Sequence, residues 1–369
     1  MTHKFFSRLF WPVWFGFLMI PFLNLKILLL LVGAGLILFF IFPFFSPWFK
    51  KLRFSHLMKP CFPFKLSFPL IIILFLLFLL ILPLFLNRYF LDVLTIAGIY
   101  IVLALGLNIV VGLSGLLVLG YIAFYAVGAY AYALLSRHQH ISFFLVLPFG
   151  AVLAFIFGIL LGMPTLRLRG DYLAIVTLGF GEMVRIVLNN WDSVTGGPNG
   201  ILHIARPKIG ALNFNHPIYY YYSILLFVIL ASLIVYRLNN SRIGRAWVSI
   251  REDELAAEAS GIDTTRLKLL AFALSASFAG TMGVFFAAKM TFVSPESFTF
   301  WESVMVLCMV VLGGMGSIPG VILGATALII LPEALRKFQL YRMLIFGATM
   351  VLMMAFRPQG LIPSQRKSP

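Results

Sequence analysis

Long uncharged apolar segments, separated by short polar ones, run along most of this chain. A helix of about 20 apolar residues crosses the hydrocarbon core of a bilayer. From residue 68 onward the apolar segments are 68–86, 93–112, 115–135, 142–162, 171–188, 219–236, 266–288, 302–316, 320–335 and 341–356. This pattern predicts an all-α fold, a polytopic helical membrane protein with about ten core transmembrane helices.

The N-terminal part adds two further apolar stretches, at 9–25 and 27–47, and then a basic linker. Lys4 and Arg8 before an apolar run resemble a signal sequence, but no convincing small-residue cleavage site follows. We therefore interpret residues 1–67 as a retained helical membrane hairpin with its basic linker. Residues 68–369 are expected to form the main membrane domain.

Composition supports a membrane protein and excludes a soluble one. The chain is 62% hydrophobic and only 11% charged, with a mean hydropathy of +1.03. So few charges could not cover a soluble surface. The net charge of +16 would suggest nucleic acid in a soluble protein. In a membrane protein, basic residues hold loops on the cytoplasmic side, so we expect a lipid bilayer and no nucleic acid as partner.

The Lys and Arg residues also predict the orientation of the chain. Placing the basic linker, the Arg167–Arg169 turn and the segment 237–265 inside puts both termini in the cytoplasm, with twelve crossings of the membrane. Arg336, Lys337 and Arg342 then fall outside. Either that short loop breaks the rule, or one of the two apolar stretches in 302–335 is re-entrant.

A dense group of charges interrupts the apolar pattern between two predicted spans. Its members are Arg237, Arg242, Arg245, Arg251, Glu252, Asp253, Glu254, Glu258, Asp263, Arg266 and Lys268. A short charged helix between spans needs water or a soluble partner to face. The segment therefore suggests that something outside the membrane drives something inside it.

Glycine and polar residues break the apolar pattern between 106 and 121. Asn108, Gly112, Ser114, Gly115 and Tyr121 are the candidates for lining a translocation path. Irregular backbone at membrane depth survives only where protein or a water-filled cavity satisfies it, and transporters hold polar substrates at broken helices. An ordinary cytoplasmic turn between two spans explains the same residues equally well.

The segment 171–188 carries charges within a predicted span. Asp171 could cap the helix, while Glu182, Arg185 and Asn189 share one helical face. Glu182 and Arg185 form an expected intramembrane ion pair. A structural role for the pair is favoured, because opposite charges at this spacing cancel each other's cost. The functional alternative is a secondary transporter that uses Glu182 as its proton carrier.

The turn at Gly196, Gly197, Pro198 and Asn199 has a composition typical of tight turns. Placed outside the membrane, it is either a plain turn or a docking loop for an external protein.

Enzyme chemistry has little support in the sequence. No Walker A pattern, zincin spacing or nucleophile elbow occurs, so no catalytic residue, cofactor or metal is expected. Cys61 and Cys308 form neither a metal spacing nor a disulfide framework, and His138 and His140 fit a solvated loop edge. A membrane-embedded enzyme is therefore the weaker class.

Several motifs together resemble the LivM-type permease, one membrane subunit of the branched-chain amino-acid ABC importer. They are GLNIVVGLSG at 106–115, LRLRGDYLAIVTLGFGE at 166–182, TGGPNG at 195–200, GRAW at 244–247 with REDE at 251–254, VSPESF at 293–298, GGMGS at 313–317 and RPQGL at 357–361. The resemblance covers about residues 90–363. It implies import of Leu, Ile and Val, with permeases for urea or short amides as the related alternative.

The resemblance also implies partners and a coupling role for part of the charged segment. The expected partners are a second, homologous permease, two cytoplasmic ABC ATPases that hydrolyse the ATP, and a periplasmic substrate-binding protein. Residues 237–265 become the cytoplasmic coupling loop of an importer permease domain. Its expected ATPase-coupling residues are Arg251, Glu252, Asp253, Glu254, Ala257 and Gly261. Gly261 stands seven residues after Glu254, one more than in the EAA loop of many ABC importers.

Overall fold

The computed structural model describes residues 77–334 except 78, 140, 166, 167, 169, 210, 211 and 215, together with 347, 348, 351 and 360–362. The chain divides into two units, 1–74 and 75–369, and all that follows concerns the second. The predicted N-terminal hairpin and its basic linker lie outside the described residues. So do the Arg167–Arg169 turn, the loop with Arg336, Lys337 and Arg342, and most of the predicted span 341–356.

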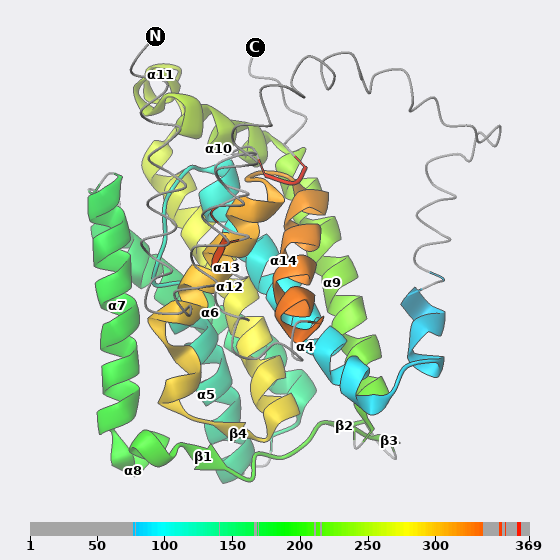
Figure 1. The fold of residues 1–369 in the computed structure, drawn as a ribbon. Coiled ribbons are helices and arrows are strands. Elements are labelled where there is room, and N and C mark those ends of the chain that lie inside the picture. Colours follow the sequence, from blue (N-terminus) through cyan, green and yellow to red (C-terminus); the bar gives the residue numbers. More distant parts are fainter. Residues whose placement is uncertain are drawn as a thin grey trace, which may run out of the picture. The chain divides into compact units, whose positions relative to one another are not determined.

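Helices make up almost all of the described chain (Figure 1). They are α4 (Arg88–Asn108), α5 (Ile122–Gln139), α6 (Phe143–Thr165), α7 (Asp171–Asn190), α8 (Asp192–Thr195), α9 (Pro217–Asn239), α10 (Arg242–Glu252), α11 (Glu254–Ala259), α12 (Thr264–Met290), α13 (Phe300–Gly313) and α14 (Ile318–Ala334). Short turns are η1 (Leu82–Leu84), the π-helical η2 (Ile109–Leu113), η3 (Gly197–Asn199) and η4 (Pro295–Phe298). Strands β1 (Ile201–Leu202) and β4 (Phe292–Val293) pair antiparallel, as do β2 (Lys208–Ile209) and β3 (Leu212–Asn213).

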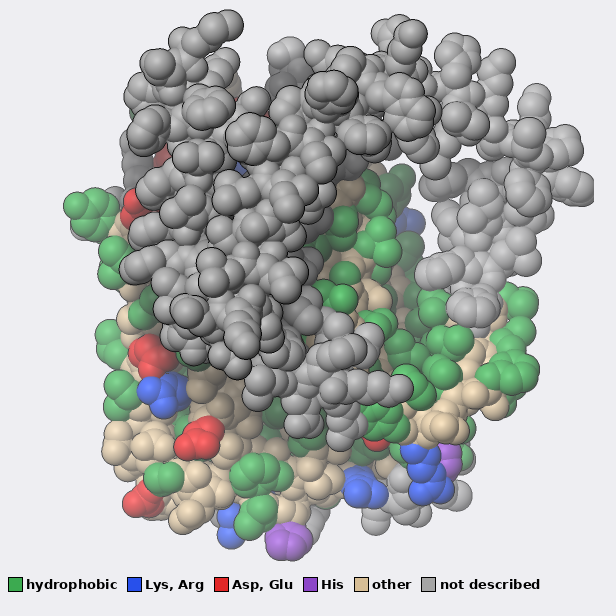
Figure 2. Space-filling model, in the orientation of Figure 1, with side chains coloured by type: hydrophobic (Ala, Val, Ile, Leu, Met, Phe, Trp, Pro, Cys, Tyr) green, Lys and Arg blue, Asp and Glu red, His purple; other side chains and the backbone are tan. Residues whose placement is uncertain are grey.

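Five described segments are long and apolar enough to cross a membrane. They are Arg88–Leu113, Phe143–Thr165, Pro217–Asn239, Thr264–Met290 and Pro295–Gly313, and Ile318–Glu333 is a shorter apolar helix. Large apolar side chains are exposed on α6, α7 and α9, and Figure 2 shows hydrophobic side chains over much of the described surface. The predicted all-helical, multi-pass membrane protein is therefore confirmed. The count of ten core spans stays a prediction.

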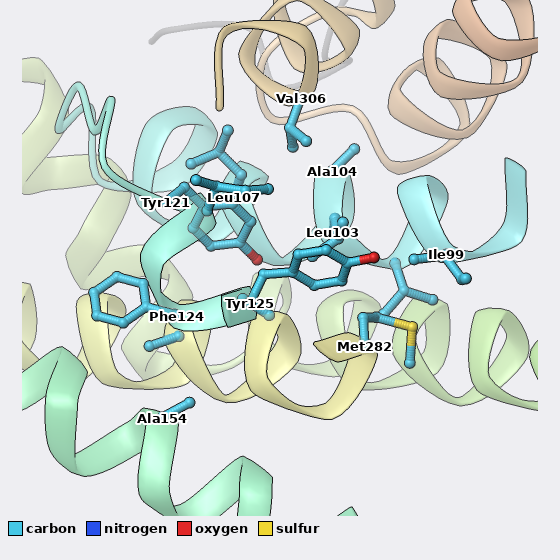
Figure 3. Close-up of a cluster of buried hydrophobic side chains, with 14 of the residues drawn as sticks. Ile99, Leu103, Ala104, Leu107, Tyr121, Phe124, Tyr125, Ala154, Met282 and Val306 are labelled. Carbon is cyan, nitrogen blue, oxygen red and sulfur yellow. The ribbon is translucent and has the colours of Figure 1, made fainter. Parts of the chain in front are cut away.

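Helix α12 is the centre of the packing and contacts α4, α5 and α6. Glycines let its backbone approach its neighbours: a Cβ on Gly128 of α5 would lie 2.0 Å from the carbonyl oxygen of Gly280 on α12. Gly158 of α6 faces Ala276 of α12 in the same way. Such close contacts suit helices in lipid, where hydrophobic burial gives no drive to associate. Figure 3 shows the adjoining core, with Met282 beside side chains of α4 and α5.

The predicted helix over 115–135 begins later than expected, at Ile122. Residues 115–120 are not helical, and their backbone groups find partners far away in the sequence. The Leu119 N–H donates to Thr177 Oγ1 (3.1 Å) and the Ile122 N–H to Ser303 Oγ (3.1 Å). Gly120 packs so tightly that a Cβ would lie 1.8 Å from the Thr177 carbonyl oxygen. Other helices thus satisfy this irregular backbone, as membrane depth requires.

Helix α7 matches the predicted segment 171–188, but the residue at its N-cap is not the predicted one. Gly170, at φ +56°, is the N-cap residue, and Asp171 lies inside the first turn. The prediction that Asp171 caps the helix is therefore wrong. In the first turn its carboxylate still lies favourably at the positive end of the helix dipole.

Candidate functional site

The charged segment folds into two short amphipathic helices, α10 and α11, at one end of the long helices (Figure 1). Helix α10 begins at Ser241, whose Oγ accepts the N–H of Gly244 at 3.1 Å. Trp247 and Ile250 are buried on one face, whereas Arg242 and Arg245 are exposed. One side of α10 is therefore packed on the bundle and the other presents positive charge.

Asp253 separates the two helices and caps α11, because its Oδ1 accepts the N–H of Ala256 at 3.1 Å. Ala257 is buried, while Leu255 is 65% exposed and Glu258 is exposed. An exposed leucine between charges was not identified from the sequence, because only the helical geometry shows which face it occupies. Just beyond α11, Gly261 adopts φ +83°, a conformation that favours glycine.

Two contacts attach this pair of helices to α12. The indole Nε1 of Trp247 donates to the carbonyl oxygen of Leu267 at 2.8 Å. The Lys268 ammonium, whose side chain is 5% exposed, pairs with the Glu254 carboxylate. Lys268 was only one charge among many in the sequence. Its burial shows that it ties α11 to the central helix.

A third contact attaches α10 to the end of α4. The Arg251 guanidinium donates to the carbonyl oxygen of Gly112 at 2.7 Å and also pairs with Glu252. Gly112 lies in the π-helical turn 109–113, a conformation that is rare and frequent at functional sites. The Arg251 stem also packs against Gly115, where a Cβ would lie 2.5 Å from Cγ. The structure thus joins the charged segment to the glycine-rich segment.

Two C-terminal motifs also make contacts near this end of α4. Asn108 Oδ1 accepts the N–H of Gly316 (2.8 Å), which lies in the loop between α13 and α14. The N–H of Leu361 donates to the carbonyl oxygen of Leu312 at 2.8 Å. Segments from distant parts of the sequence therefore meet where α10 is attached.

The candidate path residues lie in this region, and four of the five are buried within the chain. Asn108, Gly112, Ser114 and Tyr121 are buried, and only Gly115 is exposed. Ser114 Oγ donates to Val110 O (2.7 Å) and Tyr121 OH to Ser275 O (3.1 Å). These side chains hold the packing in this conformation. A role in lining the path stays a prediction.

Glu182 and Arg185 form an ion pair on α7, with Arg185 Nε and Nη2 each 2.8 Å from Glu182 Oε2. Their side chains are 30% and 34% exposed, so neither is deeply buried. Helix α7 stands at the edge of the bundle in Figure 1 and buries only Leu173, Ala174 and Thr177.

The turn at 196–199 lies at the opposite end from α10. Gly196, Gly197 and Gly200 all have positive φ, and Thr195 Oγ1 anchors the turn by donating to Leu188 O at 2.6 Å. Pro198 and Asn199 are exposed at its tip. Beside it, β1 pairs with β4, which ties the turn to the segment before α13.

Two partly buried contacts of acidic side chains were not identified from the sequence. Tyr100 OH on α4 donates to the Glu302 carboxylate on α13, across 202 residues of sequence. Lys289 on α12 pairs with Asp92 on α4, with Nζ 3.3 Å from Oδ1. The residues that the structure describes contain no group of three His, Cys, Asp or Glu side chains that could hold a metal ion.

These features define a class: a multi-pass helical membrane protein whose charged helix pair is attached to the ends of its spans. Residues 89–354 match the family described as the branched-chain amino acid transport system / permease component. The chain belongs to this family, and it is a transport subunit and not an enzyme.

Relatives with assigned roles agree with this assignment. The chain is 50% identical over 307 residues to the high-affinity branched-chain amino acid transport system permease protein LivM of Salmonella typhimurium strain LT2, covering 77% of this chain and 72% of the relative. The LivM of Escherichia coli strain K12 gives the same identity and coverage. The LivH permease of Escherichia coli strain K12 is 26% identical over 296 residues, which cover 75% of this chain and 95% of LivH. No solved structure matches the chain.

Proposed function

We propose that this chain is a permease subunit of an ATP-driven importer that carries Leu, Ile and Val across the bacterial inner membrane, with both termini in the cytoplasm. The LivM relatives, named for high-affinity branched-chain amino acid transport, support the substrate class. The chain also matches LivH, a second permease named for the same transport. That pair of related permeases supports a complex of this chain with a homologous partner, two ATPases and a periplasmic binding protein.

The observation that carries the proposal is the attachment of α10 and α11. Trp247 and Lys268 tie them to α12, and Arg251 ties them to the end of α4. Their other face is exposed and carries Arg242, Arg245, Leu255 and Glu258. A segment with one face fixed to two long helices can transmit the movement of a protein bound to its free face. We assign that free face to a cytoplasmic ATPase, with Arg251–Gly261 as the coupling residues.

The movement would act on the path between the two permeases. Movement of α10 would reach α4 through the Arg251–Gly112 contact and α12 through the Trp247–Leu267 contact. These two helices would therefore rock as a unit in alternating access. The irregular segment 108–121 lies beside the Arg251–Gly112 contact. It is the part of this chain that we propose borders the path. At the opposite end, the exposed tip of the 196–199 turn is the proposed docking point for the binding protein.

Substitution at Leu255 tests the coupling assignment without touching the attachments. Leu255→Asp should abolish ATPase co-purification and ATP-dependent leucine uptake, because the exposed leucine would lose its apolar contact. Leu255→Met is the matched control, since it keeps an exposed apolar side chain at the same position and should retain ATPase association and uptake. Both variants should reach the membrane at parental abundance. Normal ATPase association and uptake in Leu255→Asp would contradict the assignment.

A further inference from the structure

Two acidic side chains within the described long helices, Asp92 and Glu182, are neutralised by a cation. Asp92 of α4 faces Lys289, and Glu182 of α7 faces Arg185. Glu302, in the first turn of α13, accepts a hydrogen bond from Tyr100 instead. Within the described part of the chain, no Lys or Arg forms an ion pair with Glu302. Among the described residues, its negative charge therefore has no counterion.

Glu302 lies well inside the bundle along the helix axis. Helix α13 ends at Gly313, close to the α4 end that Arg251 contacts. With a rise of about 1.5 Å per residue, Glu302 stands about 16 Å from that end. We place that end at the bilayer surface, because the charged helices α10 and α11 are attached there. The hydrocarbon core of a bilayer is about 30 Å thick, so this placement puts the carboxylate near its middle.

The same side chain reaches the surface of this chain. Glu302 is half-buried, and its neighbour Trp301 is 75% exposed. An unpaired carboxylate that touches lipid at this depth is costly, and such groups face protein or a water-filled path. The surface around Trp301 and Glu302 therefore faces the path or a partner and not lipid.

The surroundings of Glu302 favour the charged carboxylate and suit a cation. The first turn of α13 places the carboxylate at the positive end of the helix dipole, and the Tyr100 hydroxyl donates to it. Tyr125, near Leu103 of α4 in Figure 3, is close enough to couple electrostatically to both groups, and its ring packs 5.4 Å from the ring of Phe298. An ammonium group is stabilised both by a carboxylate and by an aromatic ring, and the ring beside Glu302 that is exposed is that of Trp301, whereas Tyr125 and Phe298 are buried.

We propose that Glu302, held by Tyr100, receives the α-ammonium group of the amino-acid substrate as it passes along this surface. The inference rests on the proposed function and adds a substrate contact that lies outside the 108–121 segment. It also separates substrate classes: amino acids carry an ammonium group and need the carboxylate, whereas neutral urea and short amides do not.

The test uses the complete importer in proteoliposomes, with this chain, its partner permease, both ATPases and the binding protein. Leucine uptake and ATP hydrolysis are measured together for the parent, Glu302→Gln, Glu302→Asp and Glu296→Gln. Glu296 is the matched control because it is an exposed glutamate six positions earlier, in η4. We expect Glu302→Gln to assemble and to keep its stimulated ATP hydrolysis. Its leucine transported per ATP should fall about tenfold or more, the loss of about 1.4 kcal/mol that a weakened charge contact gives. Glu302→Asp should retain more uptake, and Glu296→Gln should match the parent.

Each other outcome overturns the inference. Parental transport per ATP in Glu302→Gln means that the carboxylate does not contact substrate. Failure of this variant to assemble, with Glu296→Gln intact, shows a counterion on the partner permease and an interface ion pair. An equal fall in hydrolysis and uptake shows a structural role. Absence of leucine uptake in the parent itself refutes the proposed function, and the comparison is then repeated with whichever amino acid the parent transports.

Discussion

Replacing Glu254 should lower the free energy of unfolding much more than replacing its ion-pair partner Lys268. Lys268 is 5% exposed on the central helix, whereas the Glu254 side chain is 26% exposed on α11. Glu254→Gln leaves a buried ammonium with a hydrogen-bond acceptor but no counter-charge. Lys268→Met removes the buried charge and leaves a carboxylate that water can reach.

The burial of each side chain determines how much each substitution should lower the free energy of unfolding. Stranding one charge of a fully buried pair costs about 3–5 kcal/mol, and the retained acceptor and partial exposure reduce this to about 2–3 kcal/mol for Glu254→Gln. An apolar replacement of a buried charge is often close to neutral, so Lys268→Met should cost about 1 kcal/mol or less. With both charges gone, the double variant should resemble Lys268→Met alone. The pair therefore predicts a strong coupling energy in a double-mutant cycle.

Thermal unfolding of the purified permease complex measures the order of stability, and ATP-dependent leucine uptake measures coupling. Glu254→Gln should unfold at the lowest temperature and lose most uptake, and adding Lys268→Met should restore stability. Uptake in the double variant should remain impaired, because the link from α11 to α12 is absent. Equal destabilisation by Glu254→Gln in both backgrounds would refute the reasoning, since it would show that the two charges do not interact.

Three further predictions follow from single contacts. Gly128→Ala places a Cβ 2.0 Å from the Gly280 carbonyl oxygen and should destabilise the chain by about 1–3 kcal/mol. Gly179→Ala, inside α7 with nothing within 4 Å, should instead leave the unfolding temperature unchanged or raise it slightly, because alanine favours a helix over glycine. Arg251→Met removes the donor to Gly112 and should leave ATP hydrolysis intact while uptake falls several-fold; proportional loss of both would contradict this. Glu182→Gln and Arg185→Met should each cost about 1 kcal/mol or less in unfolding measurements, because the pair is about one third exposed, and a much larger loss would show a partner that closes over α7.

The sequence predicted the long helices well, because their length and apolar content are local properties. The segments 219–236 and 266–288 correspond to α9 and α12 within a few residues. The start of α5 was missed for a physical reason. Residues 115–121 are apolar enough for a helix, but the N–H groups of Leu119 and Ile122 pair with Thr177 and Ser303, which no local pattern reveals.

Within the candidate site, the sequence predicted the charged segment between two spans but not the contacts that hold it. Charge density between two spans predicted an exposed helix, and α10 has that form. The attachments depend on Trp247, Lys268 and Gly112, and their roles follow only from tertiary contacts. Glu302 escaped notice because its lack of a cation is a property of the packed bundle.

Helix α4 connects the attachment of α10 to the site of Glu302. One of its ends continues into the turn that Arg251 contacts, and Tyr100, twelve positions before Gly112, donates to Glu302. Two further contacts, from Asn108 to Gly316 and from Lys289 to Asp92, fasten α4 to the α13–α14 loop and to α12. A displacement applied at Gly112 therefore cannot be absorbed at that end alone, because these contacts carry it along a continuous helix. Any shift of α4 along its axis moves the Tyr100 hydroxyl relative to α13, so ATPase movement would change how firmly the Glu302 carboxylate is held.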